Sequence, residues 1–129
     1  MATGFPANTG DVLSAAMYNG LTSFSIGAAQ TADYTALSAD QFQALQIMNK
    51  ATAIAFKIPT NASVAFPIGT VITVLSIGVG TCTISAVTPG TTTVLSAGAV
   101  AASPTLAQYK SAACIKTGTD AWYVVGAIG

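Results

Sequence analysis

Residues 70–87 have the sequence TVITVLSIGVGTCTISAV, and this stretch decides the expected fold. Its first half, residues 70–77, is rich in β-branched side chains, and in its second half hydrophobic residues alternate with Thr and Ser. Both patterns are typical of strands that bury one face. The segment between them, GVG at residues 78–80, predicts a three-residue hairpin loop. The residues expected on the buried face of the second strand are Cys82, Ile84 and Ala86.

Similar short segments, separated by turn-forming residues, occur along most of the chain. By the same criteria we expect further strands over residues 21–26, 34–37, 43–49, 52–58, 91–95, 105–115 and 122–125. Residues 38–42 have the composition of a turn or a single helical turn. Short strands at regular spacing predict an all-β fold, an antiparallel β-sandwich or a barrel-like domain, over residues 21–129.

Residues 1–20 are expected to form a separate N-terminal arm that ends in a short helix. The first ten residues are turn formers, and the next ten, DVLSAAMYNG, predict a helix of one or two turns. A helix this short is unstable alone, so we expect it to pack on a partner surface, or alternatively on its own domain. The candidate assembly contacts are Phe5, Val12, Leu13, Met17 and Tyr18.

The composition excludes several classes of function. The chain has 129 residues, of which 52 % are hydrophobic and only 6 % are charged, with no histidine and no net charge. Soluble domains average about 25 % charged residues. Because nucleic-acid binding needs clustered Lys and Arg, we do not expect it. The absence of histidine excludes a His-based catalytic triad and a His metal site. The most apolar stretch, residues 64–80, is interrupted by Pro and Gly, so we expect no membrane-spanning helix.

No motif for catalysis or cofactor binding is evident. Three of the four aspartates, Asp11, Asp40 and Asp120, lie at expected turns or helix starts, where Asp bonds to its own backbone. The glycines of residues 69–80 do not have the spacing of a phosphate-binding loop, and a strand follows them instead of a helix. We therefore expect no enzymatic activity, no cofactor, no metal site and no small-molecule substrate.

The two cysteines, Cys82 and Cys114, are not in a CxxC spacing and both lie on the expected inward phase of a strand. We expect buried free thiols, with a cross-strand disulfide as the alternative. Among the aromatic residues, Trp122 is expected in the core with Val124, while Tyr123 faces a partner or solvent. The alternative is a carbohydrate-binding platform formed by Trp122, Tyr123 and Tyr109.

Lysines near asparagines raise the question of an intramolecular amide crosslink. Lys50 and Lys57 lie close in sequence to Asn49 and Asn61. That chemistry needs a buried acid beside the pair, and the sequence shows none there. We therefore do not expect this crosslink.

Several segments resemble proteins of tailed bacteriophages. The opening TGDVLSAA at residues 9–16, with Asn19 beyond it, resembles the "GDVLTAA…N" openings of their virion proteins. The stretch IPTNASVAFPIGT at residues 58–70 is similar to a segment of fibre and capsid-associated domains, where a Thr-rich strand, a Gly turn and another strand follow. The segments QYKSA at residues 108–112 and TDAWYVVG at residues 119–126 also match.

This resemblance implies a structural protein, since such domains are typically trimeric and carry no catalytic or metal residues. We expect a capsid decoration (cement) protein that stabilises the shell as a homotrimer. Its partners would be the major capsid protein and its own copies, with no nucleic acid or membrane, and its location the capsid surface of a virion assembled in the host cytoplasm. The alternatives are a tail or tail-fibre component and, from another class, a glycan-binding adhesin module. The adhesin would need Trp122, Tyr109 or Tyr123 exposed in a concave site.

Overall fold

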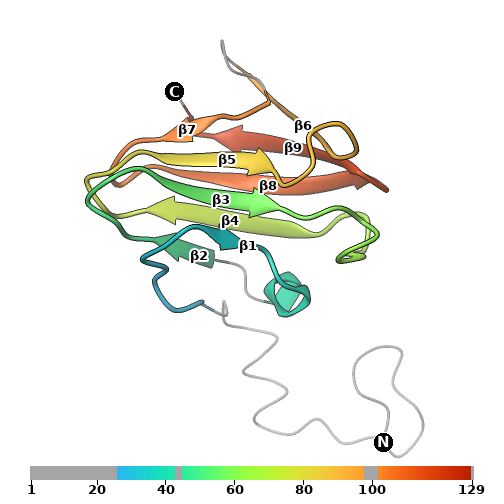
Figure 1. The fold of residues 1–129 in the computed structure, drawn as a ribbon, viewed down its shortest axis with the longest axis horizontal. Coiled ribbons are helices and arrows are strands. Elements are labelled where there is room, and N and C mark those ends of the chain that lie inside the picture. Colours follow the sequence, from blue (N-terminus) through green and yellow to red (C-terminus); the bar gives the residue numbers. More distant parts are fainter. Residues whose placement is uncertain (1–25, 43–44, 98–101, 129) are drawn as a thin grey trace, which may run out of the picture.

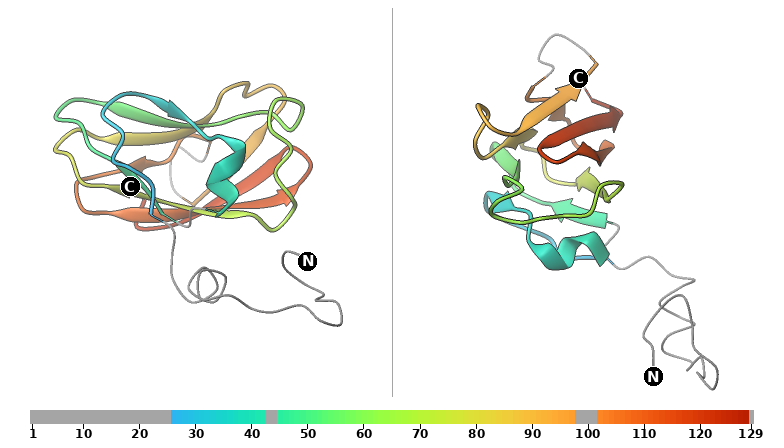
Figure 2. Two further views of the ribbon diagram at one scale, coloured as in Figure 1. Left: turned by 90° about the horizontal axis from the view of Figure 1, so that it is seen from below. Right: turned by 90° about the vertical axis from the view of Figure 1, so that its right-hand side faces the viewer.

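A computed structural model of the protein describes residues 26–42, 45–97 and 102–128. Within these ranges nine strands form two sheets packed face to face, which confirms the expected all-β sandwich (Figures 1 and 2). The expected turn at residues 38–42 is a 3-10 helix, η1 (Ser38–Phe42). The expected arm and helix of residues 1–20, with the candidate contacts Phe5, Val12, Leu13, Met17 and Tyr18, lie outside the described residues.

The sandwich consists of a four-stranded and a five-stranded sheet. The four-stranded sheet, nearer the viewer in Figure 1, contains in spatial order β1 (Tyr34–Thr35), β3 (Ile54–Ile58), β5 (Cys82–Ala86) and β7 (Thr105–Leu106). The five-stranded sheet contains in spatial order β2 (Leu45–Met48), β4 (Val71–Ser76), β8 (Ser111–Gly118), β9 (Ala121–Gly126) and β6 (Thr93–Ser96).

The expected antiparallel arrangement is wrong for most of the strand pairs. From β1 to β8 each strand lies in the opposite sheet from the one before it, and only β8 and β9 are consecutive strands that pair with each other. β1, β3 and β5 are parallel to one another, as are β2 with β4 and β6 with β9. The antiparallel pairs are β4 with β8, β5 with β7, and β8 with β9.

The predicted hairpin loop at residues 78–80 is also wrong, because β4 and β5 belong to different sheets. The loop instead lies against the loop between β2 and β3, where the Gly80 N–H donates to the Lys50 carbonyl at 2.9 Å. A Cβ atom on Gly80 would lie 1.8 Å from the Thr52 carbonyl oxygen, and one on Gly78 would lie 2.3 Å from that of Lys50. These glycines therefore permit close contact between two loops, not a tight turn.

The single strand expected over residues 105–115 is divided in two. Thr105–Leu106 belongs to the four-stranded sheet as β7, whereas Ser111–Gly118 belongs to the other sheet as β8. Between them the chain turns at Tyr109, whose φ of 65° is unusual for a residue other than glycine. The Tyr109 N–H donates to the Ser76 carbonyl at 2.6 Å, which attaches this turn to the end of β4.

The core between the sheets follows the alternation predicted from the sequence. The inward side chains of β5 are buried, as are Trp122 and Val124 of β9, whereas Tyr123 points outward; all three predictions are confirmed. Cys82 and Cys114 are buried free thiols, as expected. Burial raises the pKa of the Cys82 thiol to about 11 and that of Cys114 to about 12, because the interior disfavours the thiolate.

The burial of the two thiols predicts slow chemical labelling of the native protein. A thiolate-selective reagent at neutral pH should leave Cys82 and Cys114 unmodified until denaturant is added, when both should react rapidly. The raised pKa values mean that the fold favours the protonated thiols. This contribution to stability is complete below the pKa of the thiols in the unfolded chain. It is lost as the pH rises toward their pKa values in the folded protein, about 11 for Cys82 and about 12 for Cys114. Rapid labelling in the native state, or labelling that requires a reductant, would contradict this assignment.

Candidate functional site

The outward-facing side chains of the five-stranded sheet form an extensive apolar surface. Alternation places one set of residues in the core and the other on the outside of each strand. We call the outer set the apolar face; it consists of Leu45, Ile47, Val71, Thr73, Leu75, Thr93, Leu95, Ser111, Ala113, Ile115, Thr117, Ala121, Tyr123 and Val125.

The strand register joins the largest of these side chains into a continuous row. Val71 of β4 pairs with Ile115 of β8, which pairs with Tyr123 of β9, which pairs with Leu95 of β6. Of these, Val71 is 46 %, Tyr123 47 % and Leu95 40 % exposed. Val125, in the adjacent row, is 51 % exposed. The isolated chain therefore leaves a row of large hydrophobic side chains in contact with solvent across four strands.

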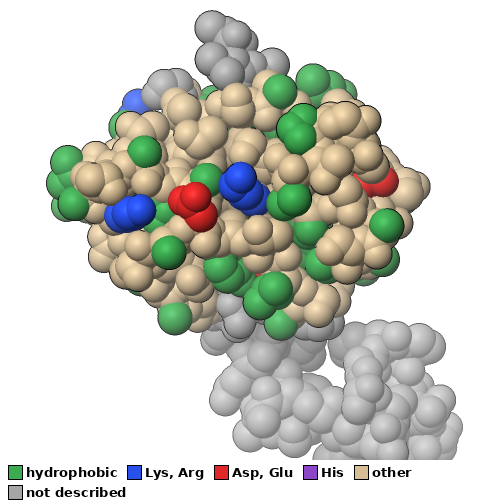
Figure 3. Space-filling view, viewed as in Figure 1, with side chains coloured by type: hydrophobic (Ala, Val, Ile, Leu, Met, Phe, Trp, Pro, Cys, Tyr) green, Lys and Arg blue, Asp and Glu red, His purple; other side chains and the backbone are tan. Residues whose placement is uncertain are grey.

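No charged side chain interrupts the apolar face. The strands of this sheet contain one charged residue, Lys116, and it points into the core with 2 % of its surface exposed. The outward side chains of the four-stranded sheet are different, since most are polar: Thr35, Ala55, Lys57, Thr83, Ser85 and Thr105. Figure 3 shows this second face, with Lys and Asp side chains near its middle. The two outer surfaces of one sandwich thus have opposite character.

The apolar face is large enough to form the centre of a protein–protein interface. Five strands spaced about 4.8 Å apart, each contributing about five residues, cover roughly 400 Å². Apolar patches of about 300–600 Å² are the largest found on typical monomers and are often functional. A standard interface buries about 800 Å² on each partner. The face would therefore supply about half of one side of such an interface, and its surroundings the remainder.

The carboxylate of Asp40 holds the fold together and does not form part of an open site. It accepts hydrogen bonds from the Tyr34 hydroxyl at 2.7 Å, the Leu37 N–H at 2.8 Å and the Gln46 side-chain amide at 3.0 Å. Burial, together with the hydrogen bond to Asp40, raises the pKa of Tyr34. These contacts connect the segment after β1 to β2, so Asp40 stabilises the edge shared by the two sheets.

The described residues meet the requirements of neither a metal site nor a membrane-spanning helix. They contain no cluster of three or more His, Cys, Asp or Glu side chains that could hold a metal ion. None of their helices is long and apolar enough to cross a membrane.

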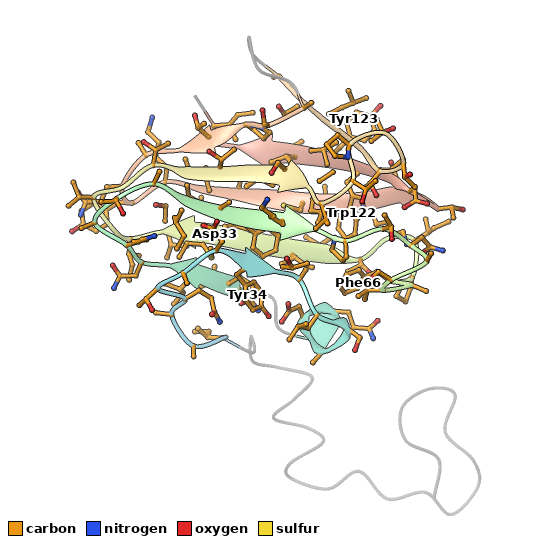
Figure 4. The ribbon with its side chains drawn as sticks, viewed as in Figure 1. Asp33, Tyr34, Phe66, Trp122 and Tyr123 are labelled. Carbon is orange, nitrogen blue, oxygen red and sulfur yellow. The ribbon has the colours of Figure 1, made fainter. Side chains whose placement is uncertain are left out.

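The aromatic residues proposed as an alternative glycan platform are not brought together. Trp122 is 2 % exposed and packs edge-to-face on Phe66, with ring centroids 5.7 Å apart and planes at 90° (Figure 4). Tyr109 is 74 % exposed on the turn before β8, and Tyr123 lies on the apolar face. Trp122 is therefore unavailable to stack on a sugar ring, which removes the largest surface that this alternative needs.

The sequence contained a signal for the apolar face that the alternation argument did not use. Residues 71–75, VITVL, are hydrophobic at positions of both phases, and residues 122–125, WYVV, are hydrophobic throughout. Near-continuous hydrophobic runs are typical of strands that are buried on both faces. Among the described residues nothing packs on the outer face of these strands, so their second hydrophobic phase is left exposed or half-buried.

Comparison of the chain with protein-family models, curated proteins and solved structures found no match.

Proposed function

We propose that the protein is a structural assembly subunit whose copies associate through the apolar face. The observation that carries this proposal is a five-stranded sheet whose outer surface contains no charged residue, on a chain with 6 % charged residues overall. Exposed hydrophobic surface of this extent favours association in water. Repulsion between charged surfaces, which normally keeps soluble proteins apart, is weak here.

The chemistry of the apolar face favours a second copy of the chain as its occupant. A partner with charged groups at this position would leave those charges buried and unpaired, which costs several kcal/mol per group. Another copy presents an equally uncharged surface, and closed symmetric oligomers are the usual result of such self-association. We propose a trimer, because the phage domains that the sequence resembles are typically trimeric.

The biological setting proposed for this oligomer is the capsid surface of a tailed bacteriophage. It is supported by the resemblance of residues 58–70 and 119–126 to phage virion domains. A decoration protein acts without chemistry, since it stabilises a shell by binding to the assembled state. In this proposal the apolar face joins the copies, and the arm of residues 1–20 binds the major capsid protein.

Deletion of residues 2–20 should distinguish the contact between copies from the contact with the major capsid protein. The sheets and their core lie within the described residues, so the truncated protein should keep its native Trp122 fluorescence, its thermal transition and its oligomeric mass. It should lose attachment to phage shells that lack the protein, measured by co-sedimentation, while the full-length chain attaches in many copies. A truncated chain that still attaches at normal occupancy, or one that unfolds, would contradict the proposed role of the arm. Full-length protein that binds tails and not shells would favour the tail alternative.

A further inference from the structure

Lys116 is the buried charged residue of the five-stranded sheet, and its contacts are specific. Its Nζ atom donates to the side-chain oxygen Oδ1 of Asn61 at 2.6 Å and to the carbonyl of Phe66 at 2.7 Å. Asn61 lies in the loop between β3 and β4, far from Lys116 in sequence. The first of these distances is short for a hydrogen bond from nitrogen to oxygen. Because a carbonyl bond is about 1.2 Å long, the amine nitrogen lies within about 3.8 Å of the Asn61 Cγ carbon.

A carboxylate is held against the same asparagine. The Asp120 Oδ1 atom accepts a hydrogen bond from the Asn61 backbone N–H at 2.8 Å and another from the Thr92 hydroxyl at 3.2 Å. Asp120 also acts electrostatically on Lys116. The amine and the carboxamide therefore meet at one end of the sandwich, where the Asp120 carboxylate is bonded to the backbone of the same asparagine; the three groups come from β8, the loop between β3 and β4, and the turn before β9.

Burial shifts the protonation equilibrium of the Lys116 amine toward its neutral, nucleophilic form. Lys116 is 2 % exposed, and its burial lowers the pKa of the ammonium group, an effect that the negative charge of Asp120 partly opposes. Phe66 is also buried, and its ring packs edge-to-face on Trp122. A buried lysine with a lowered pKa is a recognised nucleophile, and a fixed geometry replaces the entropy loss of bringing two groups together.

We propose that Lys116 and Asn61 form an intramolecular amide bond. The Nζ lone pair attacks the Asn61 Cγ carbon, the bond from Cγ to Nδ2 breaks, and Nδ2 leaves as ammonia. One C–N bond forms and one breaks, so no oxidant or reductant is needed. Asp120, whose charge acts on Lys116, accepts the proton released by Nζ through an intervening water molecule and returns it to the leaving nitrogen. The crosslink would tie β8 to the loop between β3 and β4 and replace a buried amine with an amide.

The proposal differs from the crosslink considered from the sequence alone. The sequence alone places Lys50 and Lys57 near Asn49 and Asn61. Lys57 instead lies on the outer surface of β3, whereas the fold brings Lys116 to the asparagine. The acid that we assign to this step is the half-buried Asp120, which lies 59 residues beyond Asn61 in the chain.

Intact-mass spectrometry of the purified full-length protein tests the proposal. The wild-type chain should be lighter than its sequence by one ammonia, whereas Lys116→Met and Asn61→Ala should each have the full mass of their sequence. Lys57→Met, which removes a partly exposed lysine on the outer surface of β3, is the matched control and should retain the loss. A wild-type chain of unchanged mass would overturn the proposal whether or not the variants fold.

Tryptic peptides identify the linked residues. Trypsin cleaves after lysine, so an unlinked chain yields residues 58–110 and residues 111–116 as separate peptides. An acylated Lys116 resists cleavage, and the linked chain should instead give residues 58–110 joined to residues 111–129. Loss of ammonia without this joined peptide would assign the change to cyclisation of Asn61 on its own backbone and would overturn the proposal.

The variant Asp120→Asn separates proton transfer from positioning. Its carboxamide oxygen can still accept the hydrogen bond from the Asn61 N–H, but it cannot take a proton at neutral pH. We expect a folded protein, judged by Trp122 fluorescence, in which the joined peptide forms at least ten times more slowly. Formation at the wild-type rate would overturn the role of Asp120 as proton acceptor. These tests use mass alone, so their outcome is independent of the proposed oligomer.

Discussion

Replacement of Tyr123 by lysine should convert the oligomer to a folded monomer. Tyr123 lies near the middle of the apolar face and is 47 % exposed in the isolated chain, so a lysine there remains solvated in the monomer. In the assembly the same ammonium would be buried without a partner, at a cost of about 3–5 kcal/mol for each subunit. Light scattering at micromolar concentration should report a mass of one chain for Tyr123→Lys and a multiple of it for the wild type.

The variant Ser85→Lys is the matched control for this experiment. Ser85 lies on an interior strand of the four-stranded sheet, on its outer surface, where Lys57 is already present. The control should keep the wild-type mass. Dissociation of both variants would indicate a nonspecific effect of charge, and a wild-type chain that is monomeric would contradict self-association through the apolar face.

Replacement of Gly80 by alanine should be among the most damaging single-methyl additions in this protein. The new Cβ atom would lie 1.8 Å from the Thr52 carbonyl oxygen and 2.2 Å from its carbon, so the backbone of two stacked loops would have to separate. That movement would also break the hydrogen bond from the Gly80 N–H to the Lys50 carbonyl. We expect a loss of about 3 kcal/mol or more in the free energy of unfolding, measured by urea denaturation with Trp122 fluorescence.

Gly90→Ala provides the comparison, because nothing lies within 4 Å of a Cβ atom at position 90. Its free energy of unfolding should be within about 1 kcal/mol of the wild-type value. Alanine restricts the unfolded chain more than glycine does, which favours a slight stabilisation. Equal destabilisation by both substitutions would show that the contact with Thr52 is not the cause.

The sequence predicted the strands of this protein much better than their pairing. The alternation in residues 82–86 was sufficient to assign β5 and its buried face, because that pattern depends on local geometry alone. The loop before this strand, at residues 78–80, was wrongly predicted to join β4 and β5 as a hairpin. A Gly-Val-Gly segment between two strands is compatible with a hairpin and with a close crossing, and only the distant Lys50 and Thr52 distinguish the two.

The contacts of Lys116 show a second limit of prediction from the sequence. Cys114 was correctly placed in the core, and Lys116, two residues later on the same strand, necessarily shares its face. Its burial could therefore have been predicted. Its partners could not, because Asn61 and the Phe66 carbonyl reach Lys116 only through the fold of the loop between β3 and β4. The candidate contacts predicted in the arm do not include any residue of the apolar face, which depends on which strands are adjacent.

The crossing of the chain between the two sheets has a consequence for how the protein folds during synthesis. From β1 to β8 no strand has its immediate successor as a partner, so hairpins cannot form while these strands emerge from the ribosome. The first local pair is β8 with β9, and β9 also fills the position between β8 and β6. Pairing that is dominated by distant segments makes folding slow. The five-stranded sheet is therefore completed only after translation of β9, and the nascent chain depends until then on protection from aggregation.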